Sequence, residues 1–411
     1  MSILTDRSRI ETDWACPRRR YWSTEYNTYA GDDSLYIGTE TTMGWPAGMQ
    51  QAQLSPALAF GLAVHTGLEY QILENTRSAG SHTRWVPSDE QWCPPEEGGR
   101  YMMEGRGPGA STATDPQAPV NIWQSLTDDQ RDTAHALLEG FFQVVWPAWM
   151  TQYDPVSVEQ ELEMTVQGVT FMVRPDLLLR DKKTGDLWYP DFKTFTSWNN
   201  RKWDWSLQQQ LTLLAAEEAL GTPITGAWVQ GLGKGSGRKG VLYHPLVYGY
   251  RHPGTPGVTD PTFGTKRRTG FERFNTTEYP DGGLPGWIAQ LQKKEPEMVA
   301  KCFPRTSPLF LKTHLMRKEI LPQIARRERE IHLLRSTYGE NPDAHRAQFP
   351  MIMSQCETGY GRCQFFEACH VKPIRTDPIN SGLYTPRRPH HFAEQALCER
   401  KVENAELGRA Q

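Results

Sequence analysis

The sequence has no long apolar run, and this absence sets the first limits on the protein. No stretch reaches the ~18 apolar residues that a membrane-spanning helix needs. Residues 1–20 contain no apolar segment of the kind found in secretory signals. We therefore expect a cytoplasmic protein without a membrane partner. In that compartment its seven cysteines are more consistent with metal ligands or reduced thiols than with disulfides.

A strong excess of positive charge is missing as well. The 411 residues include 45 Lys and Arg and 48 Asp and Glu, giving a net charge of −3. This balance argues against a protein that coats nucleic acid over its whole surface, so any nucleic-acid contact must be local. Short basic runs do occur, and each by itself is typical of a solvated face: Arg18–Arg20, Lys266–Arg268 and Arg326–Arg329.

The composition is that of a folded chain, with 38% apolar and 23% charged residues. Helical periodicity and caps predict helices at residues 57–75, 127–146, 203–220 and 308–338, the last kinked at Pro322. β-Branched and aromatic runs predict strands at residues 165–173, 176–180, 187–193, 227–232 and 241–250. Residues 31–55, 78–119 and 252–286 are expected to be loops. This order predicts an α/β fold with a central mixed sheet covered by helices.

Two aspartates and a lysine in the strand region indicate phosphodiester chemistry. Asp176 precedes one expected strand, while Asp191 and Lys193 lie on the next, where a period of two places both side chains on one face. Carboxylates bind Mg²⁺ or Mn²⁺, and the carbonyl of Phe192 would add an oxygen ligand. A lysine beside the ion can orient water and neutralise charge on a phosphate. Taken alone, however, an Asp-x-Lys pair is more often a solvated cross-strand pair.

The surrounding motifs resemble the PD-(D/E)XK nuclease superfamily, and within it the RecB-like exonucleases, including the CRISPR-associated group and its phage relatives. In that branch a Gly-x-x-x-His helix, an Asp, a D/E-x-K strand and a Gln-x-x-x-Tyr helix follow one another. Here the corresponding segments are Gly61–His65, Asp176, Asp191–Lys193 and Gln210–Leu214. The chain departs from the pattern in two places, because Leu214 replaces the tyrosine and because three consecutive glutamines precede Leu211.

The resemblance implies a restriction-endonuclease-like core and assigns roles to individual residues. His65, Asp176, Asp191 and the Phe192 carbonyl would bind Mg²⁺ or Mn²⁺, Lys193 would be the catalytic lysine, and Gln210 would position the lysine or the scissile phosphate. A histidine on an apolar helix is otherwise usually a satisfied core residue. Glu159 and Glu161 lie just upstream, where a structural or solvent-exposed role is favoured over a place beside the metal.

Four cysteines form a second pattern, with one at the start of the chain and three near its end. Cys356, Cys363 and Cys369 are separated by six and five residues, and Cys16 precedes Pro17 and three arginines. Four thiolates fit Zn²⁺ or an iron–sulfur cluster, and spacing alone does not decide between them; ordinary reduced thiols are the alternative. The resemblance implies a [4Fe–4S] cluster joining N- and C-terminal segments, although related chains have two residues where this one has six. Cys93, Cys302 and Cys398 match no pattern and are expected to be plain thiols.

The expected organisation is one nuclease domain over residues 1–372 and a polar tail over residues 373–411. The nuclease core would span about residues 150–250, and the cluster segments about residues 8–22 and 350–372. The resemblance implies cleavage of single-stranded DNA or DNA ends in phage or mobile-element DNA processing. Arg18, Arg19 and Arg20 would contact phosphates. Residues 233–237 lack the spacing of a P-loop, so a helicase or recombination partner would have to unwind DNA. The alternative is a non-catalytic nucleic-acid-binding or assembly protein that kept the fold.

Overall fold

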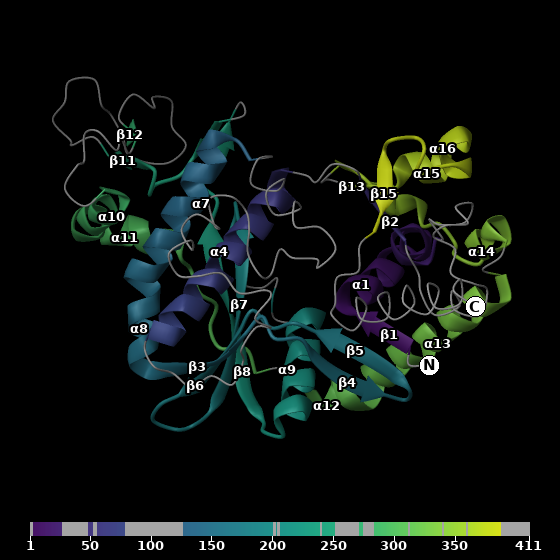
Figure 1. The fold of residues 1–411 in the computed structure, drawn as a ribbon, viewed down its shortest axis with the longest axis horizontal. Helices are drawn as coiled ribbons and strands as arrows, with labels where there is room; N and C mark the ends of the chain where they lie inside the picture. The colour runs from purple at the N-terminus through teal and green to yellow at the C-terminus, as the bar shows by residue number, and fades with distance from the viewer. Residues whose placement is uncertain are drawn as a thin grey trace, which may run out of the picture.

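The computed structural model describes residues 3–26, 48–51, 56–78, 126–199, 203, 206–238, 241–250, 271–273, 283–310, 313–338, 341–358 and 361–387. Most of the loops expected at residues 31–55, 78–119 and 252–286 lie outside these ranges, as do Cys93, Cys398 and the tail beyond residue 387. The architecture is mixed α/β, with two mixed sheets flanked by helices (Figure 1). Within the described residues, none of the helices is both long and apolar enough to cross a bilayer.

The larger sheet has four strands in the order β3-β6-β7-β8. They are β3 (Tyr153–Val158), β6 (Leu177–Asp181), β7 (Leu187–Phe195) and β8 (Ile224–Gly233). Strand β6 is antiparallel to both β3 and β7, and β8 runs parallel to β7 because helix α9 (Leu207–Leu220) carries the chain back between them. The predicted left-handed end of that helix is confirmed at Gly221, which has a φ of 61°.

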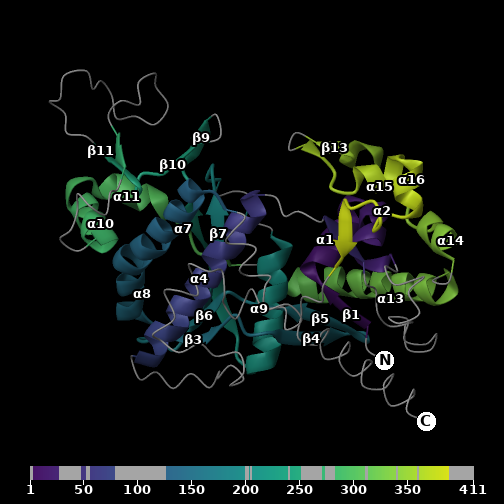
Figure 2. The ribbon, with the colours of Figure 1, turned by 45° about the horizontal axis from the view of Figure 1, so that its top comes forward.

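Successive side chains of a strand point to opposite faces, and in this sheet both faces are packed against other elements. On one face Phe192 and Trp228 pack with helices α4 (Pro56–Ser78), α7 (Asp128–Gly140) and α8 (Trp146–Gln152). On the other face Leu178 and Tyr189 pack against α9 and the smaller sheet. Figures 1 and 2 show α4, α7 and α8 together on one side of the sheet. The sheet is therefore a central layer covered on both faces.

The smaller sheet contains β1 (Ile3–Asp6), β5 (Val169–Val173) and β4 (Leu162–Val166), with β1 parallel to β5. The single strand predicted over residues 165–173 is wrong. The chain turns between β4 and β5 at Gln167 and Gly168, whose φ values are 50° and 79°. Two consecutive positive φ values are the geometry of a tight hairpin turn. The β-branched residues on either side concealed that turn in the sequence.

Two prolines, Pro147 and Pro322, lie in the first turn of a helix, and neither of them ends its helix. Thr127 caps α7 as predicted, with Gln130 completing a capping box. The helical path then continues through a π-helical turn at Phe141–Val145 into α8, where Pro147 occupies the first turn. A second π-helical turn, Met316–Ile320, precedes Pro322 at the start of α13 (Leu321–Tyr338). A proline is tolerated in a first turn because its missing N–H has no partner to lose there.

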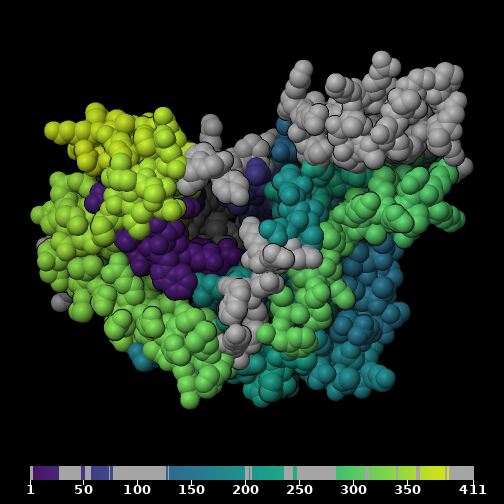
Figure 3. All heavy atoms as spheres, turned by 180° about the vertical axis from the view of Figure 1, so that it is seen from behind, coloured from purple at the N-terminus to yellow at the C-terminus, as the bar shows by residue number. Residues whose placement is uncertain are grey.

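The two ends of the described chain lie side by side, at one side of the molecule (Figures 1 and 2). Their elements are α1 (Arg7–Ala15), α2 (Pro17–Arg20), β2 (Met49–Gln51), α13, α14 (Pro342–Ala347), β13 (Glu357–Thr358), β14 (Gly361–Arg362), α15 (Phe366–His370), α16 (Lys372–Thr376) and β15 (Tyr384–Pro386). Strands β2 and β15 pair, and Tyr21, Trp22, Phe349 and Phe365 share a small core. Seen from behind, the N-terminal atoms lie against the C-terminal segments (Figure 3). We call this region the terminal lobe.

The remaining described elements lie outside the terminal lobe (Figure 1). They are β9 (Ser236–Arg238), β10 (Val241–Tyr243), β11 (Tyr248–Tyr250), β12 (Phe271–Arg273), α10 (Gly283–Lys294), α11 (Pro296–Cys302) and α12 (Thr313–Leu315). The strand predicted over residues 241–250 is divided into β10 and β11, which pair with different partners.

Candidate metal centre

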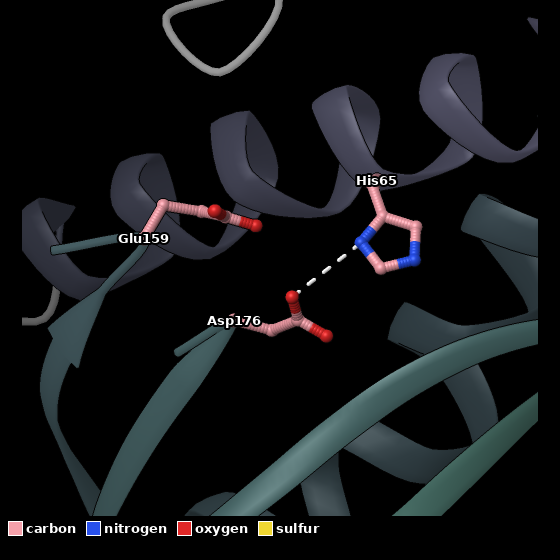
Figure 4. A group of neighbouring side chains, drawn as sticks. All are labelled: His65, Glu159 and Asp176. Atoms are coloured by element: carbon pink, nitrogen blue, oxygen red, sulfur yellow. Dashed lines mark ion pairs between the residues drawn. The ribbon is translucent and has the colours of Figure 1, made fainter. Parts of the chain in front are cut away.

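Three side chains converge where β3 ends and β6 begins. His65 comes from α4, Glu159 follows β3 and Asp176 precedes β6, and their ligand atoms all lie within 4.8 Å of one another (Figure 4). Antiparallel pairing of β3 with β6 brings the two acids together, and the Glu159 N–H donates to the Asp176 carbonyl at 3.2 Å. The His65 Nδ1 lies 3.6 Å from Asp176 Oδ1. One imidazole and two carboxylates in this arrangement can hold a divalent cation.

The negative charge of this group is not balanced within it. Burial, followed by the charges of Asp176 and Glu69, holds the pKa of Glu159 well above its usual range. Burial alone would also raise the pKa of Asp176, but His65, Lys193 and the Phe192 N–H outweigh it and lower that pKa. Arg174 lies 3.2 Å from Glu159 and compensates only part of the charge. A cation at this position would relieve the remaining repulsion.

Asp191 lies next to the group but faces α9. The side chain is fully buried, and the group of three within 4.8 Å includes Glu159 where Asp191 was expected. Asp191 Oδ1 accepts hydrogen bonds from Tyr189, Lys193 and Gln208, at 2.9, 2.8 and 2.9 Å. Its Oδ2 accepts one from Gln209 at 3.0 Å. Side chains of the protein therefore occupy both carboxylate oxygens in this structure.

Lys193 connects Asp191 with the group. The predicted alternation along β7 is confirmed, because Tyr189, Asp191 and Lys193 meet on one face while the Phe192 ring packs on the other. The Lys193 side chain is 22% exposed. Its positive charge opposes the rise in the pKa of Glu159 and contributes to the lowered pKa of Asp176. Phe192 contributes a backbone N–H, which donates to Asp176 Oδ2 at 2.6 Å. Its carbonyl as a metal ligand remains a prediction.

Two glutamines at the start of α9, Gln208 and Gln209, donate hydrogen bonds to the Asp191 carboxylate. The buried Gln210 has no hydrogen bond to Asp191 or Lys193 in the described part of the chain. Its role toward the lysine or the scissile phosphate stays a prediction. Three consecutive glutamines hid the register, and only the position of α9 over β7 resolves it. Arg7 of α1 also donates to the oxygen of Gln208, which fixes the direction of that amide.

The four cysteines predicted to hold a cluster all lie in the terminal lobe. The thiols of Cys16 and Cys363 act electrostatically on both Cys356 and Cys369. The Ile352 N–H approaches Cys16 Sγ at 3.4 Å, and the Trp22 indole N–H approaches Cys369 Sγ at 3.3 Å. Burial, followed by the neighbouring thiols and Glu357, raises the pKa of Cys356.

Four thiolates suit either tetrahedral Zn²⁺ or an iron–sulfur cluster. Among the described residues, the close group of candidate metal ligands is His65, Glu159 and Asp176 rather than these cysteines. A metal or cluster at the four cysteines therefore stays a prediction.

The arginine run next to Cys16 divides into residues with different environments. Arg20 is 1% exposed and forms ion pairs with Glu25 and Glu328, so the prediction that it contacts DNA is corrected: its guanidinium is committed inside the protein. Arg18 is partly buried and donates to the Phe349 carbonyl at 2.7 Å. Arg19 is also partly buried, and its phosphate contact remains a prediction.

The sequence undervalued Glu159 and missed Tyr189 altogether. Glu159 has a φ of 46°, which is uncommon for a residue other than glycine and is found at functional sites more than elsewhere. No sequence signal separated it from Glu161. Tyr189 lies two residues before Asp191, and the period of two could have indicated it. No protein-family model matches the chain, and no curated protein matches it.

Proposed function

We propose that the protein is a metal-dependent DNA nuclease that hydrolyses phosphodiester bonds. The observation that carries this proposal is one constellation: a group of cation ligands, His65, Glu159 and Asp176, next to a lysine fixed by a buried carboxylate. The ligands come from three separate elements and the lysine from a fourth, so the fold assembles them from a distance in sequence. Phosphodiester hydrolysis requires this combination of a cation and a positioned positive charge.

The residues present fit Mg²⁺ or Mn²⁺. Two carboxylates supply hard oxygens, and one imidazole is compatible with Mn²⁺ in particular. The raised pKa of Glu159, caused by burial and by Asp176 and Glu69, supports a site that gains from added positive charge. His65, Glu159 and Asp176 would hold the ion, and Asp191 would join them on releasing part of its hydrogen bonding. The ion would supply Lewis acidity toward the phosphate and toward an attacking water.

The chain's own residues would perform the remaining work. The partly exposed Lys193 ammonium would donate a hydrogen bond to the scissile phosphate and neutralise its developing charge. Asp191 would hold that ammonium in place, since the two groups are 2.8 Å apart. Gln208 and Gln209 would limit the movement of Asp191. Preorganisation of this kind matters because a misplaced charge contributes little to the transition state.

We also propose that the core is restriction-endonuclease-like. Three antiparallel strands, a helix and a fourth strand parallel to the third support this assignment. The proximity of His65 to Asp176 and of Lys193 to Asp191 also supports it. On that basis the substrate would be single-stranded DNA or DNA ends, cut as an exonuclease would cut them. A helicase or recombination partner would supply unwinding.

For the terminal lobe we propose a [4Fe–4S] cluster held by Cys16, Cys356, Cys363 and Cys369. Electrostatic interaction among the thiols and N–H groups directed at two sulfurs support a thiolate site, and the RecB-like resemblance favours a cluster over Zn²⁺. Anaerobically purified protein should be brown and contain iron and sulfide, and Cys363→Ser should lose both while Cys302→Ser keeps them. A colourless protein that contains zinc would reject the cluster.

A digestion assay tests the nuclease proposal. Purified protein with Mg²⁺ or Mn²⁺ should degrade end-labelled DNA, and Lys193→Ala should reduce the rate by roughly 10²–10³-fold. Lys183→Ala is the matched control, since Lys183 is exposed in the β6–β7 turn, and it should cleave like the parent. Undiminished cleavage by Lys193→Ala would reject the mechanism. Metal-independent DNA binding without cleavage would favour the non-catalytic alternative.

A further inference from the structure

Asp191 is the most heavily hydrogen-bonded side chain of the site. An ionised carboxylate only accepts hydrogen bonds and has room for about four. Here it has four side-chain donors, two from its own strand and two from α9. Lys193 is the donor with a charge and with partial exposure. The other three donors hold the Asp191 carboxylate, and the position of that carboxylate determines where Lys193 is held.

Tyr189 differs from the two glutamines in rigidity. Its ring is fully buried between β7 and α9, and it belongs to the same strand as Asp191 and Lys193. A tyrosine has two side-chain torsions and loses little freedom when packed. The hydroxyl must donate to Asp191, which leaves its oxygen to accept from Thr212 of α9.

We propose that Tyr189 is a positioning residue of the nuclease site: its hydroxyl fixes the Asp191 carboxylate and, through it, the Lys193 ammonium. The inference rests on the proposed function, which gives Lys193 its task. Packing alone does not require the hydroxyl, because a phenylalanine ring would fill the same space in the core between β7 and α9. The hydroxyl therefore acts on the orientation of Asp191 rather than on the stability of the sheet.

The test separates the hydroxyl from the ring. In Tyr189→Phe, kcat for DNA cleavage should fall about tenfold, which corresponds to the loss of one hydrogen bond at the reacting centre, while KM changes by less than about twofold. Thr212→Val, which removes the partner of the hydroxyl, should change kcat in the same direction by a smaller factor. Tyr153→Phe is the matched control, a buried tyrosine of β3 outside the site, and should retain the parent kcat.

A second measurement does not depend on cleavage. Reductive methylation with ¹³C-formaldehyde labels lysine ammonium groups, and the Lys193 signal is the one lost in Lys193→Arg. That signal should move in Tyr189→Phe and in Thr212→Val, and stay in place in Tyr153→Phe. An unchanged kcat together with an unmoved signal would overturn the inference, as would a change in KM alone. If the parent protein cleaves no DNA, the proposed function fails, and the Lys193 signal still decides whether Tyr189 positions the lysine.

Discussion

The candidate metal site and the terminal lobe each hold a glutamate largely away from solvent, and they differ in how far the protein balances its charge. In the terminal lobe Glu25 accepts hydrogen bonds from Arg20 and Arg335. Burial alone would raise the pKa of Glu25, but Arg335 and Arg20 outweigh burial and lower it to about 2. At the candidate metal site burial, Asp176 and Glu69 outweigh Arg174 and Lys193, so the pKa of Glu159 is raised. The contrast separates charge that the protein balances itself from charge that an external cation could balance.

The largest expected difference is in the response to removing each charge. Glu25→Gln removes the carboxylate that pairs with Arg335 and one of the two that pair with the buried Arg20, and it should lower the free energy of unfolding by roughly 3–5 kcal/mol. Denaturant unfolding followed by circular dichroism measures this change. The control Glu330→Gln alters an exposed ion pair and should cost less than about 1 kcal/mol. Equal losses in the two variants would show that the buried network contributes nothing special.

The same substitution at the metal centre should have the opposite sign. Glu159→Gln mimics the protonated side chain that its surroundings favour, so metal-free protein should gain stability, by about 1 kcal/mol for each pKa unit relieved. The exposed Glu163→Gln on β4 serves as the control and should leave the metal-free unfolding energy unchanged. A loss of stability in Glu159→Gln as large as that in Glu25→Gln would contradict the contrast between the two regions.

The smallest effects are in the dependence of stability on pH. The pKa of Glu25 is lowered, so its contribution is complete above about pH 4.5 and is lost as pH falls toward about 2. The pKa of Glu159 is raised, so metal-free protein should lose stability as the pH rises from the usual pKa of a glutamate through the raised pKa of Glu159. Thermal unfolding measured across this pH range should show two losses. Glu25→Gln should lose the fall in stability at acid pH, and Glu159→Gln should lose the fall in stability as the pH rises. A variant that keeps the fall in stability assigned to its residue would refute that assignment.

Local chemistry in the sequence predicted caps and helix ends better than features that depend on distant pairing. Thr127 caps α7, and Gly221 ends α9 with a left-handed residue, because each depends on a few adjacent residues. The hairpin turn at Gln167 and Gly168 was missed because the residues around it favour extended backbone. Strand β1 was missed because its stability comes from pairing with β5, far away in the sequence.

For the candidate site, the resemblance grouped His65 with Asp176, Asp191 and Lys193, and the structure places these residues near one another. The place of Glu159 depends on the pairing of β3 with β6, which no local pattern reveals. The glutamine register depends on how α9 crosses β7. The burial of Arg20 depends on Glu328, 308 residues away, so a basic run in the sequence could not disclose it.

Manganese binding in the absence of DNA tests the central claim most directly. Titration with Mn²⁺, followed by the electron paramagnetic resonance signal of the free ion, should give saturable binding to the parent protein. Asp176→Asn should lose that binding, because it removes one of the two carboxylates in the group of His65, Glu159 and Asp176. Asp154→Asn, at an exposed carboxylate of β3, should bind like the parent. No saturable binding to the parent, or equal affinity in Asp176→Asn, would contradict the account.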